Sequence, residues 1–414
     1  MTSSKEDNDV EKNKESLTIA RMTFLHHLQF FITTNGRMEI LLPFFKNDTA
    51  LYSIAVNNAI RTSYVLSIIL NPLMLELSKI FGRLNIINFG IYYRTATKLL
   101  VSLFPTGNIE LLTAYANAPG EQTINSFSVY LSDIYKGDAT KLAAAQAQKN
   151  AYTFAGLIIG PLLGGFLVRQ NVRLPYLFAG MCGLGEMYLS NQLKEYVPKE
   201  DRMTFGDIDY SKINPFGFIK LFLSGGKMAA LSFMHICSHI SGPRGYGIME
   251  DLLRTEWYGN TFSIMDRSYI KSFSSVLLVV GYANGGRLVK AFGGASKLFF
   301  TSSLILILQR LYQWLFSKTL FMDYLFQIIN LSKPLSDVGS NVMLRQEAKR
   351  QNVKPAELEV MLGNMEEITS VFCYPAWAMV YAYCLRSNDV RRWYGALAFI
   401  TSVQYVLGTY ANSS

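Results

Sequence analysis

The sequence predicts an all-α membrane protein whose chain crosses the bilayer twelve times, as two six-helix bundles related by a pseudo-twofold axis. Half of the 414 residues are apolar and only 17% are charged, whereas about a quarter are charged in an ordinary soluble domain. Apolar segments of about 20 residues, the length that crosses a bilayer, recur along the whole chain. A loop pattern also repeats about half a chain apart, which is typical of paired repeats in transporters.

The apolar segments divide the chain into a tail, two bundles and a linker. Residues 1–21 are polar and are expected to form a disordered tail. The first bundle, residues 22–195, contains the expected spans 22–45, 52–78, 85–104, 109–132, 144–168 and 174–194. A polar linker at 196–227 precedes the second bundle, residues 228–411, with the expected spans 228–248, 268–289, 295–316, 320–343, 361–385 and 391–411.

The repeat joins two loops in equivalent places of the two bundles. Glu76–Phe89 reads ELSKIFGRLNIINF and Arg287–Phe300 reads RLVKAFGGASKLFF, and leucine, lysine, Phe-Gly and the final Phe coincide at an offset of 211 residues. Lys and Arg are more frequent in the loops on the side of the termini and the linker than in the opposite loops. The positive-inside rule therefore places both termini and the linker in the cytoplasm.

Other classes of protein find little support. The basic residues behind the net charge of +9 lie in short loops rather than in one stripe with aromatics, so no nucleic-acid partner is expected. No phosphate-binding loop or hydrolase motif occurs, so the chain is not expected to be an enzyme. We expect no cofactor and no metal, and the cysteines are expected to be buried free thiols without metal-ligand spacing: Cys182, Cys237, Cys373 and Cys384.

The segment GLIIGPLLGG, at Gly156–Gly165, is the strongest motif. Its small residues one helical turn apart allow a neighbouring helix to approach closely, and Pro161 removes a backbone donor. It resembles the antiporter motif of the major facilitator superfamily, in the branch that includes tetracycline and multidrug exporters. The motif residues are Gly156, Gly160, Pro161, Gly164 and Gly165.

Two further elements resemble the same family, each with departures. Lys79, Gly82 and Arg83 match its loop signature after the second span, but Ser78 stands at the position of its aspartate, and the second copy has Val289 there and Gly294 in place of arginine. Asp133 stands where the family keeps an aspartate at the end of the fourth span, and we expect it to accept hydrogen bonds at the helix boundary. The arginine associated with proton coupling falls at Ala114, which leaves proton antiport unsupported.

Polar residues inside the spans are the candidate substrate or coupling site, because a charge at mid-bilayer costs about 2.5–3.5 kcal/mol or more without a partner or a wet cavity. In facilitator proteins the first, fourth, seventh and tenth spans line the cavity. The candidates on these spans are Arg37, Glu39, Glu121, Gln122, Asn125, His235, His239, Lys333 and Asp337.

Some of these candidates have simpler roles open to them. Arg37 and Glu39 sit near a span end, where long side chains reach the interface. His235 and His239 share a helix face and are better explained by interhelical hydrogen bonds than by a metal. Lys333 and Asp337, four residues apart, are expected to pair with each other. Glu121, beside Pro119 and Gly120, is the foremost site residue because those neighbours loosen the helix.

The resemblance implies a secondary active or facilitative transporter that carries a small organic solute by alternating access, as a monomer in the lipid bilayer. Protons are a candidate second partner, and uniport is equally open. The alternative is a facilitator-like scaffold that does not transport and serves as an interaction subunit of a membrane assembly. The missing charges at Ser78, Val289 and Ala114 favour this alternative, and the retained glycine motif favours transport.

Overall fold

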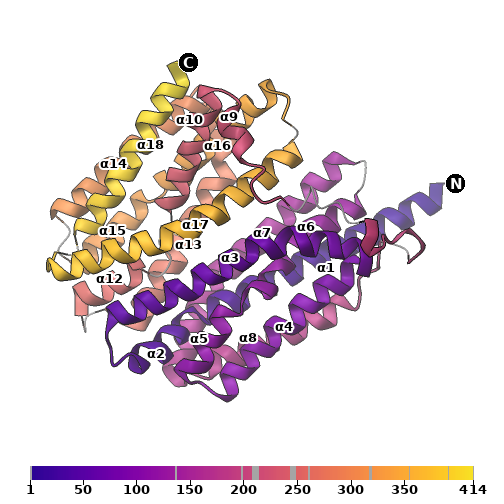
Figure 1. Cartoon of the computed structure of the whole chain (residues 1–414), viewed down its shortest axis with the longest axis horizontal. Coiled ribbons are helices and arrows are strands. Elements are labelled where there is room, and N and C mark those ends of the chain that lie inside the picture. The colour runs from indigo at the N-terminus through magenta and orange to yellow at the C-terminus, as the bar shows by residue number, and fades with distance from the viewer. Residues whose placement is uncertain are drawn as a thin grey trace. The chain divides into compact units, whose positions relative to one another are not determined.

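The computed structural model describes residues 2–135, 138–196, 199–207, 214–242, 249–259, 262–316, 319–353, 355–389 and 391–413. The regular elements in these residues are helices, and no strand occurs among them (Figure 1). The first half contains α1 (Thr2–Ile32), α2 (Thr34–Phe44), α3 (Thr49–Phe81), α4 (Arg83–Leu103), α5 (Gly107–Tyr115), α6 (Ala118–Ile134), α7 (Ala139–Gln170) and α8 (Leu174–Ser190). The predicted all-α class is confirmed.

The second half continues the pattern after a short irregular segment. That segment holds the 3-10 turns η1 (Lys199–Asp201) and η2 (Phe205–Asp207) and the helix α9 (Ile219–Leu223). The helices that follow are α10 (Gly226–Ile240), α12 (Met249–Tyr258), α13 (Ile264–Ala291), α14 (Ala295–Phe316), α15 (Leu320–Ile329), α16 (Ser332–Arg350), α17 (Pro355–Arg386) and α18 (Arg392–Ser413). The twelve apolar ranges of the sequence all overlap helices.

Contacts group the chain into two compact units, each described here by itself. Unit 1 comprises Met1–Asn47 and Leu66–Asn214, and unit 2 comprises Asp48–Val65 and Pro215–Ser414. The change of unit at Asn214 falls inside the segment expected to be the linker. The first half of α3 groups with unit 2, a division that hydropathy alone does not reveal.

Few of the described helices have the length and mean hydropathy that identify a membrane-spanning helix by composition alone. Thr49–Phe81, Ala144–Gln170 and Val360–Arg386 are long and apolar enough, and a fourth candidate arises if Ile264–Ala291 and Ala295–Phe316, bent by 120°, count as one span. Several other helices carry buried charged side chains, such as Arg94 in α4, which lower their mean hydropathy.

In unit 1, the glycine face of α7 packs directly on the backbone of α1. A Cβ added at Gly156 would lie 3.1 Å from the Phe24 oxygen and the Leu28 nitrogen, and one at Gly164 would lie 2.3 Å from the Ile32 oxygen. A Cβ at Gly160 would lie 2.5 Å from the Phe31 Cβ. The prediction that Gly160 and Gly164 pack against another helix backbone is therefore confirmed, because only glycine permits this approach.

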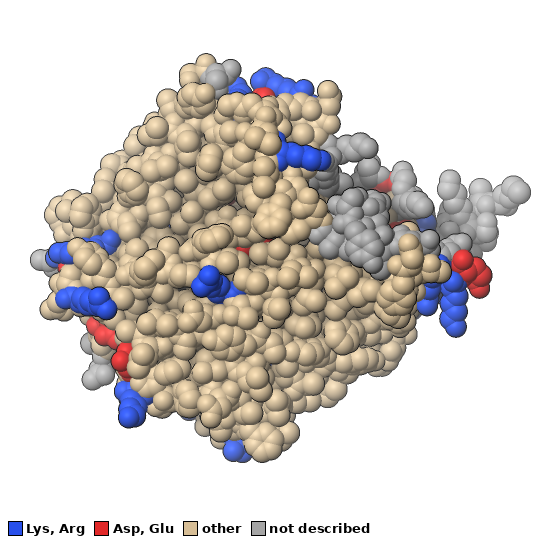
Figure 2. All heavy atoms as spheres, in the orientation of Figure 1, with Lys and Arg blue, Asp and Glu red and all other residues tan. Residues whose placement is uncertain are grey.

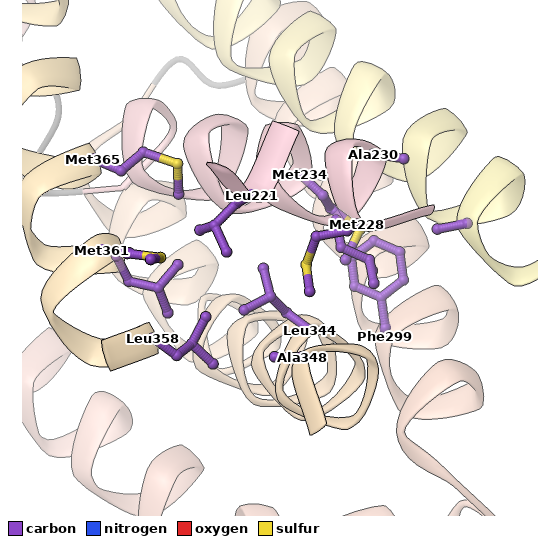
Figure 3. Close-up of a cluster of buried hydrophobic side chains, with 13 residues drawn as sticks. Leu221, Met228, Ala230, Met234, Phe299, Leu344, Ala348, Leu358, Met361 and Met365 are labelled. Atoms are coloured by element: carbon purple, nitrogen blue, oxygen red, sulfur yellow. The ribbon is translucent and has the colours of Figure 1, made fainter. Parts of the chain in front are cut away.

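The core of unit 2 is rich in methionine (Figure 3). Side chains from α9, α10, α14, α16, α17 and α18 meet there, and the buried set includes Met228, Met234, Met361, Met365, Leu221, Leu344, Leu358 and Phe299. Unbranched methionine fills irregular gaps between helices that cross at different angles. The cluster joins α10, α16 and α17, the helices that carry the polar residues described below.

Three of the expected spans are interrupted rather than continuous. The first breaks between α1 and α2 at Thr33, the fourth between α5 and α6 at Ala116 and Asn117, and the tenth between α15 and α16 at Asn330 and Leu331. Pro119 and Pro334 follow the second and third breaks within one turn. Proline cannot donate a backbone hydrogen bond, which explains why the helices restart at these points.

The amino-terminal tail differs from the sequence expectation. Disorder was expected for residues 1–21, but α1 begins at Thr2. The polar tail makes long-range hydrogen bonds, since the Tyr130 hydroxyl donates to the Glu15 carboxylate at 3.1 Å and the Tyr135 hydroxyl to Asn13 Oδ1 at 3.1 Å. These tyrosines belong to the end of the fourth span, so the tail folds as part of unit 1 although its composition resembles that of disordered segments.

The outer surface of the helices is largely apolar. Figure 2 shows broad areas without Lys, Arg, Asp or Glu. Exposed large side chains include Phe166 and Leu184 in unit 1 and Phe372 and Phe399 in unit 2. An apolar surface this extensive suits contact with lipid and would be unusual on a soluble monomer.

Candidate functional site

A cluster of polar and charged side chains lies inside unit 2, where α10 meets α16 and α17. Helix α10 contributes His235, Ser238 and His239, which lie within about one helical turn of one another. Helix α16 contributes Lys333, Asp337 and Asn341, and α17 contributes Glu366 and Ser370. The four candidates predicted from this half of the sequence, His235, His239, Lys333 and Asp337, therefore belong to one connected group of helices.

Lys333 and Asp337 form a closed ion pair. The Lys333 ammonium lies 2.5 Å from Asp337 Oδ1, and it also donates to the Ser238 carbonyl at 3.1 Å and to Ser238 Oγ at 2.7 Å. An ammonium has three N–H donors, so all of them are used within the protein. The predicted pairing is confirmed, and Lys333 acts as a link between α16 and α10 in the observed state.

His235 bridges α16 and α17. Its Nδ1 lies 3.1 Å from Asn341 Oδ1 and its Nε2 lies 3.0 Å from the Glu366 carboxylate. His239, one turn further along, lies 2.8 Å from the Ser370 hydroxyl through Nε2. These contacts are the interhelical hydrogen bonds expected for the two histidines. Among the described residues no group of three or more His, Cys, Asp or Glu is arranged to hold a metal ion.

Arg37 of α2 contacts a carboxylate that the sequence analysis did not single out. Its Nε lies 2.6 Å from Glu110 Oε1 of α5, and the Glu110 side chain is only 1% exposed. Glu39, two residues further along α2, is half-buried. The Arg37–Glu110 pair connects the short helices α2 and α5, each of which belongs to an interrupted span.

The remaining candidates of the fourth span lie outside the described side chains. The backbone of α6 is described through Glu121, Gln122 and Asn125, but the side chains of these three residues are not. Their role as site residues stays a prediction.

A fully buried charge network in unit 1 was not predicted from the sequence. Arg94 of α4 lies 2.5 Å from Glu186 Oε2 of α8, and Glu186 Oε1 accepts from Gln29 Nε2 of α1 at 2.5 Å. Arg94 also donates to Gln29 Oε1 at 3.2 Å and to the Gly120 carbonyl at 3.1 Å. Arg94, Glu186 and Gln29 are 3%, 0% and 0% exposed, so they hold spans together where neither solute nor lipid reaches them.

Arg94, a charged residue inside the expected third span, could have indicated this network from the sequence. The family resemblance directed attention to the first, fourth, seventh and tenth spans, whereas Arg94 and Glu186 lie in the third and sixth. An arginine in such a span needs a partner by default, although the sequence does not say which one.

The residues of the loop signature form a second charge cluster, at the junction of α3 and α4. Arg83 Nε donates to Asp133 Oδ2 at 2.9 Å, and the same guanidinium donates to the Ser78 hydroxyl. Lys79 pairs with Glu76, which is 4% exposed. Asp133 thus accepts a hydrogen bond at the end of α6, as expected.

Glycine allows the same junction to turn tightly. Gly82 has φ +96°, a backbone conformation that side chains disfavour, and a Cβ there would lie 2.5 Å from a Glu195 carboxylate oxygen. Serine at position 78 still accepts a hydrogen bond from Arg83, so the junction keeps its polar contacts without the family's aspartate.

An apolar pocket of about 560 Å³ in unit 2 is separate from the polar cluster. It lies between α10, α17 and α18, and its lining includes Ile236, Ile240, Phe372, Trp377 and Phe399. No charged side chain lines it, so it offers nothing that would orient a polar solute.

Comparison with known proteins identifies the fold. No family model and no curated protein matches the chain. The structure of the nucleoside transporter NupG matches with a TM-score of 0.73 and 11% identity, over 96% of this chain and 99% of that one. A POT family transporter in complex with 5-aminolevulinic acid matches with a TM-score of 0.71 and 10% identity, over 96% and 95% of the two chains.

The major facilitator superfamily transporter FucP, in the outward conformation, matches with a TM-score of 0.63 and 12% identity, over 97% of this chain and 99% of that one. Identities this low show the fold alone. The chain has the fold of major facilitator transporters, a polytopic membrane fold, over almost its whole length, so the predicted all-α facilitator fold is confirmed. The number of twelve spans stays a prediction.

Proposed function

We propose that this chain, folded as a major facilitator transporter from end to end, carries a small organic solute across a membrane by alternating access. The observation that carries the proposal is the match over 95–99% of the length of the three solved transporters. Transporters of this fold hold the solute near mid-membrane between two helical repeats. On this proposal the chain works without catalysis.

The polar cluster of unit 2 is proposed as part of the solute site, with His235, His239 and Glu366 as candidate contact residues. The Lys333–Asp337 pair has no net charge, and all three N–H donors of the Lys333 ammonium bind groups of the protein. We therefore do not propose Lys333 as the residue that binds an organic anion. From unit 1 we propose Glu121, Gln122 and Asn125 as candidate site residues.

His235 is the proposed proton-coupling residue. Both of its ring nitrogens face oxygen atoms, of Asn341 and of Glu366. A neutral imidazole can donate through only one nitrogen, whereas an imidazolium donates through both. Protonation of the His235–Glu366 pair is therefore linked to contacts among α10, α16 and α17, and a proton entering or leaving the pair would change how these helices are held.

The proposal also covers the membrane topology, the branch of the family and the oligomeric state. Twelve spans would leave both termini and the linker at 196–227 in the cytoplasm, with bundles at 22–195 and 228–411. The GLIIGPLLGG segment supports a relation to the tetracycline and multidrug exporter branch. We propose a monomer in the bilayer as the working form.

Uptake by the purified full chain in liposomes tests the proposed transport. The probes are a nucleoside and 5-aminolevulinic acid, the solutes named for two structural neighbours, NupG and the POT family transporter. Saturable uptake of at least one probe above empty liposomes is the expected result. A folded, correctly inserted protein that moves neither of them, with or without a pH gradient, would support the non-transporting scaffold instead.

Proton coupling is tested with matched variants on α10. His235→Gln should flatten the pH dependence of uptake of whichever probe is carried, while His239→Gln, one turn away, should leave the shape of the profile unchanged. If both variants keep the original profile, the carrier is a uniporter or is coupled elsewhere, and transport itself remains established by the liposome assay.

A further inference from the structure

The interruption of the tenth span is held by a chain of amide side chains. Gln309 of α14 donates through Nε2 to the Phe326 carbonyl at 3.1 Å and to Asn330 Oδ1 at 2.8 Å. Asn330 Nδ2 then donates to Gln327 Oε1 at 2.8 Å, which also accepts from Ser274 Oγ of α13 at 2.7 Å. Two neighbouring helices are therefore fastened to the point where α15 ends and α16 begins.

The interruption of the fourth span is held from the equivalent helix of unit 1. The Tyr93 hydroxyl of α4 donates to the Ala116 carbonyl, which lies between α5 and α6. Arg94, the next residue, donates to the Gly120 carbonyl at 3.1 Å in the first turn of α6. Carbonyls in the last turn of a helix lose their helical partners, and the Tyr93 hydroxyl supplies a partner for the Ala116 carbonyl just after α5.

The two sets of clamping residues lie on corresponding helices of the two halves, α4 and α14, although their positions along those helices differ by five residues from the offset of the loop repeat. Tyr93–Arg94 and Gln309–Arg310 are consecutive pairs on the third and ninth spans, separated by 216 residues. Arg94 and Arg310 are both buried, at 3% and 5% exposure. Arg310 donates to the Leu397 and Ser241 carbonyls at 3.0 and 2.9 Å. In each half, the first residue of the pair reaches the broken helix and the arginine ties neighbouring spans together.

We propose that Tyr93 and Gln309 are positioning residues that fix the direction in which α6 and α16 leave the interruptions of the fourth and tenth spans. Helix α16 carries Lys333, Asp337 and Asn341, so Gln309 sets where these site residues lie relative to His235 on α10. The proposal concerns the two broken helices and is independent of which solute is carried.

Hydrogen–deuterium exchange of the purified full chain tests the clamp in unit 2. Gln309→Leu removes both amide contacts, and Gln313→Leu is the matched control, because Gln313 lies one turn along the same helix and is equally buried. Each net hydrogen bond corresponds to about a two- to tenfold change in a local opening equilibrium. Peptides covering 326–333 should therefore exchange about two- to tenfold faster or more in Gln309→Leu only.

A smaller change tests the clamp in unit 1. Tyr93→Phe removes only the hydroxyl that contacts Ala116, and its control is Tyr92→Phe on the neighbouring, half-exposed ring. Peptides covering 114–120 should exchange about two- to tenfold faster in Tyr93→Phe. The thermal midpoint and the exchange of α7 and α8 should stay the same.

A positioning residue should change hydrogen–deuterium exchange only near the helix break, whereas a residue that simply stabilises the fold should change exchange along the whole chain. Exchange that rises along the whole chain in Gln309→Leu, or not at all at 326–333, overturns the clamp in unit 2. Exchange at 114–120 that is the same in Tyr93→Phe and Tyr92→Phe overturns the clamp in unit 1. Tyr93→Phe removes one oxygen atom, so it remains informative if Gln309→Leu fails to fold.

Discussion

Substitution of Gly164 by alanine should loosen the contact between α7 and α1. The added Cβ would lie 2.3 Å from the Ile32 carbonyl oxygen and 3.0 Å from its Cα. Both atoms belong to backbone, which cannot swing aside as a flexible side chain can. The two helices must therefore separate, and the contacts along the glycine face of α7 at Gly156 and Gly160 weaken with them.

The size of the effect follows from this geometry. Ordinary carbon contacts lie near 3.5 Å, so α1 must retreat by about 1 Å. A gap of that size forfeits about a quarter to a half of the dispersion energy of the atoms that line it, and overpacking of a tight interior costs about 1–3 kcal/mol. Gly164→Ala should lower the free energy of unfolding by about 1–3 kcal/mol, and Gly164→Leu by more.

The assay is denaturant titration of the purified protein in one detergent, followed by the fraction folded. Gly286→Ala in α13 and Gly363→Ala in α17 are matched controls, since a Cβ at either position meets nothing within 4 Å. Both should be neutral or stabilising by about 0.5–1 kcal/mol, because alanine favours the helix more than glycine does. Equal stability of Gly164→Ala and the two controls would refute the close-packing argument.

Three further predictions address charges and topology. Arg94→Met should lower the free energy of unfolding by about 3–5 kcal/mol, because it leaves Glu186 buried without its cation, and adding Glu186→Met should recover part of the loss in a double-mutant cycle. Lys333→Met should cost about 1.5–3 kcal/mol in the same titration, since it removes charged hydrogen bonds between α16 and α10. Cysteines introduced as Val10→Cys and Phe205→Cys should react with a membrane-impermeant maleimide from the same side of the bilayer, and labelling from opposite sides would contradict the even number of spans expected in the first bundle.

Local features of the site were accessible from the sequence, whereas contacts between distant spans were not. The Lys333–Asp337 pair was predicted because four residues bring two side chains together on any helix. The role of Gly160 and Gly164 was predicted because small residues at that spacing allow two helices to approach closely. Glu110 and Glu186, by contrast, find their arginines 73 and 92 residues away, and nothing in one sequence specifies such a partner.

The interruptions of the spans were only partly foreseen. Pro119 and Gly120 indicated that the fourth span is loosened, and the break indeed precedes them. The Gly120 carbonyl, in the first turn of α6, accepts a hydrogen bond from Arg94. Hydropathy could not show this, because an interrupted span and a continuous one contain the same apolar residues.

The network around Arg94 also constrains the order in which the chain can settle into the membrane during synthesis. Arg94 reaches the bilayer with the third span, but Glu186 follows 92 residues later, a delay on the order of 10 s at usual rates of translation. An arginine without a partner costs about 2.5–3.5 kcal/mol in lipid. Gln29, already synthesised, is the partner at hand, so the third span should stay beside the first, or within the insertion machinery, until the sixth arrives.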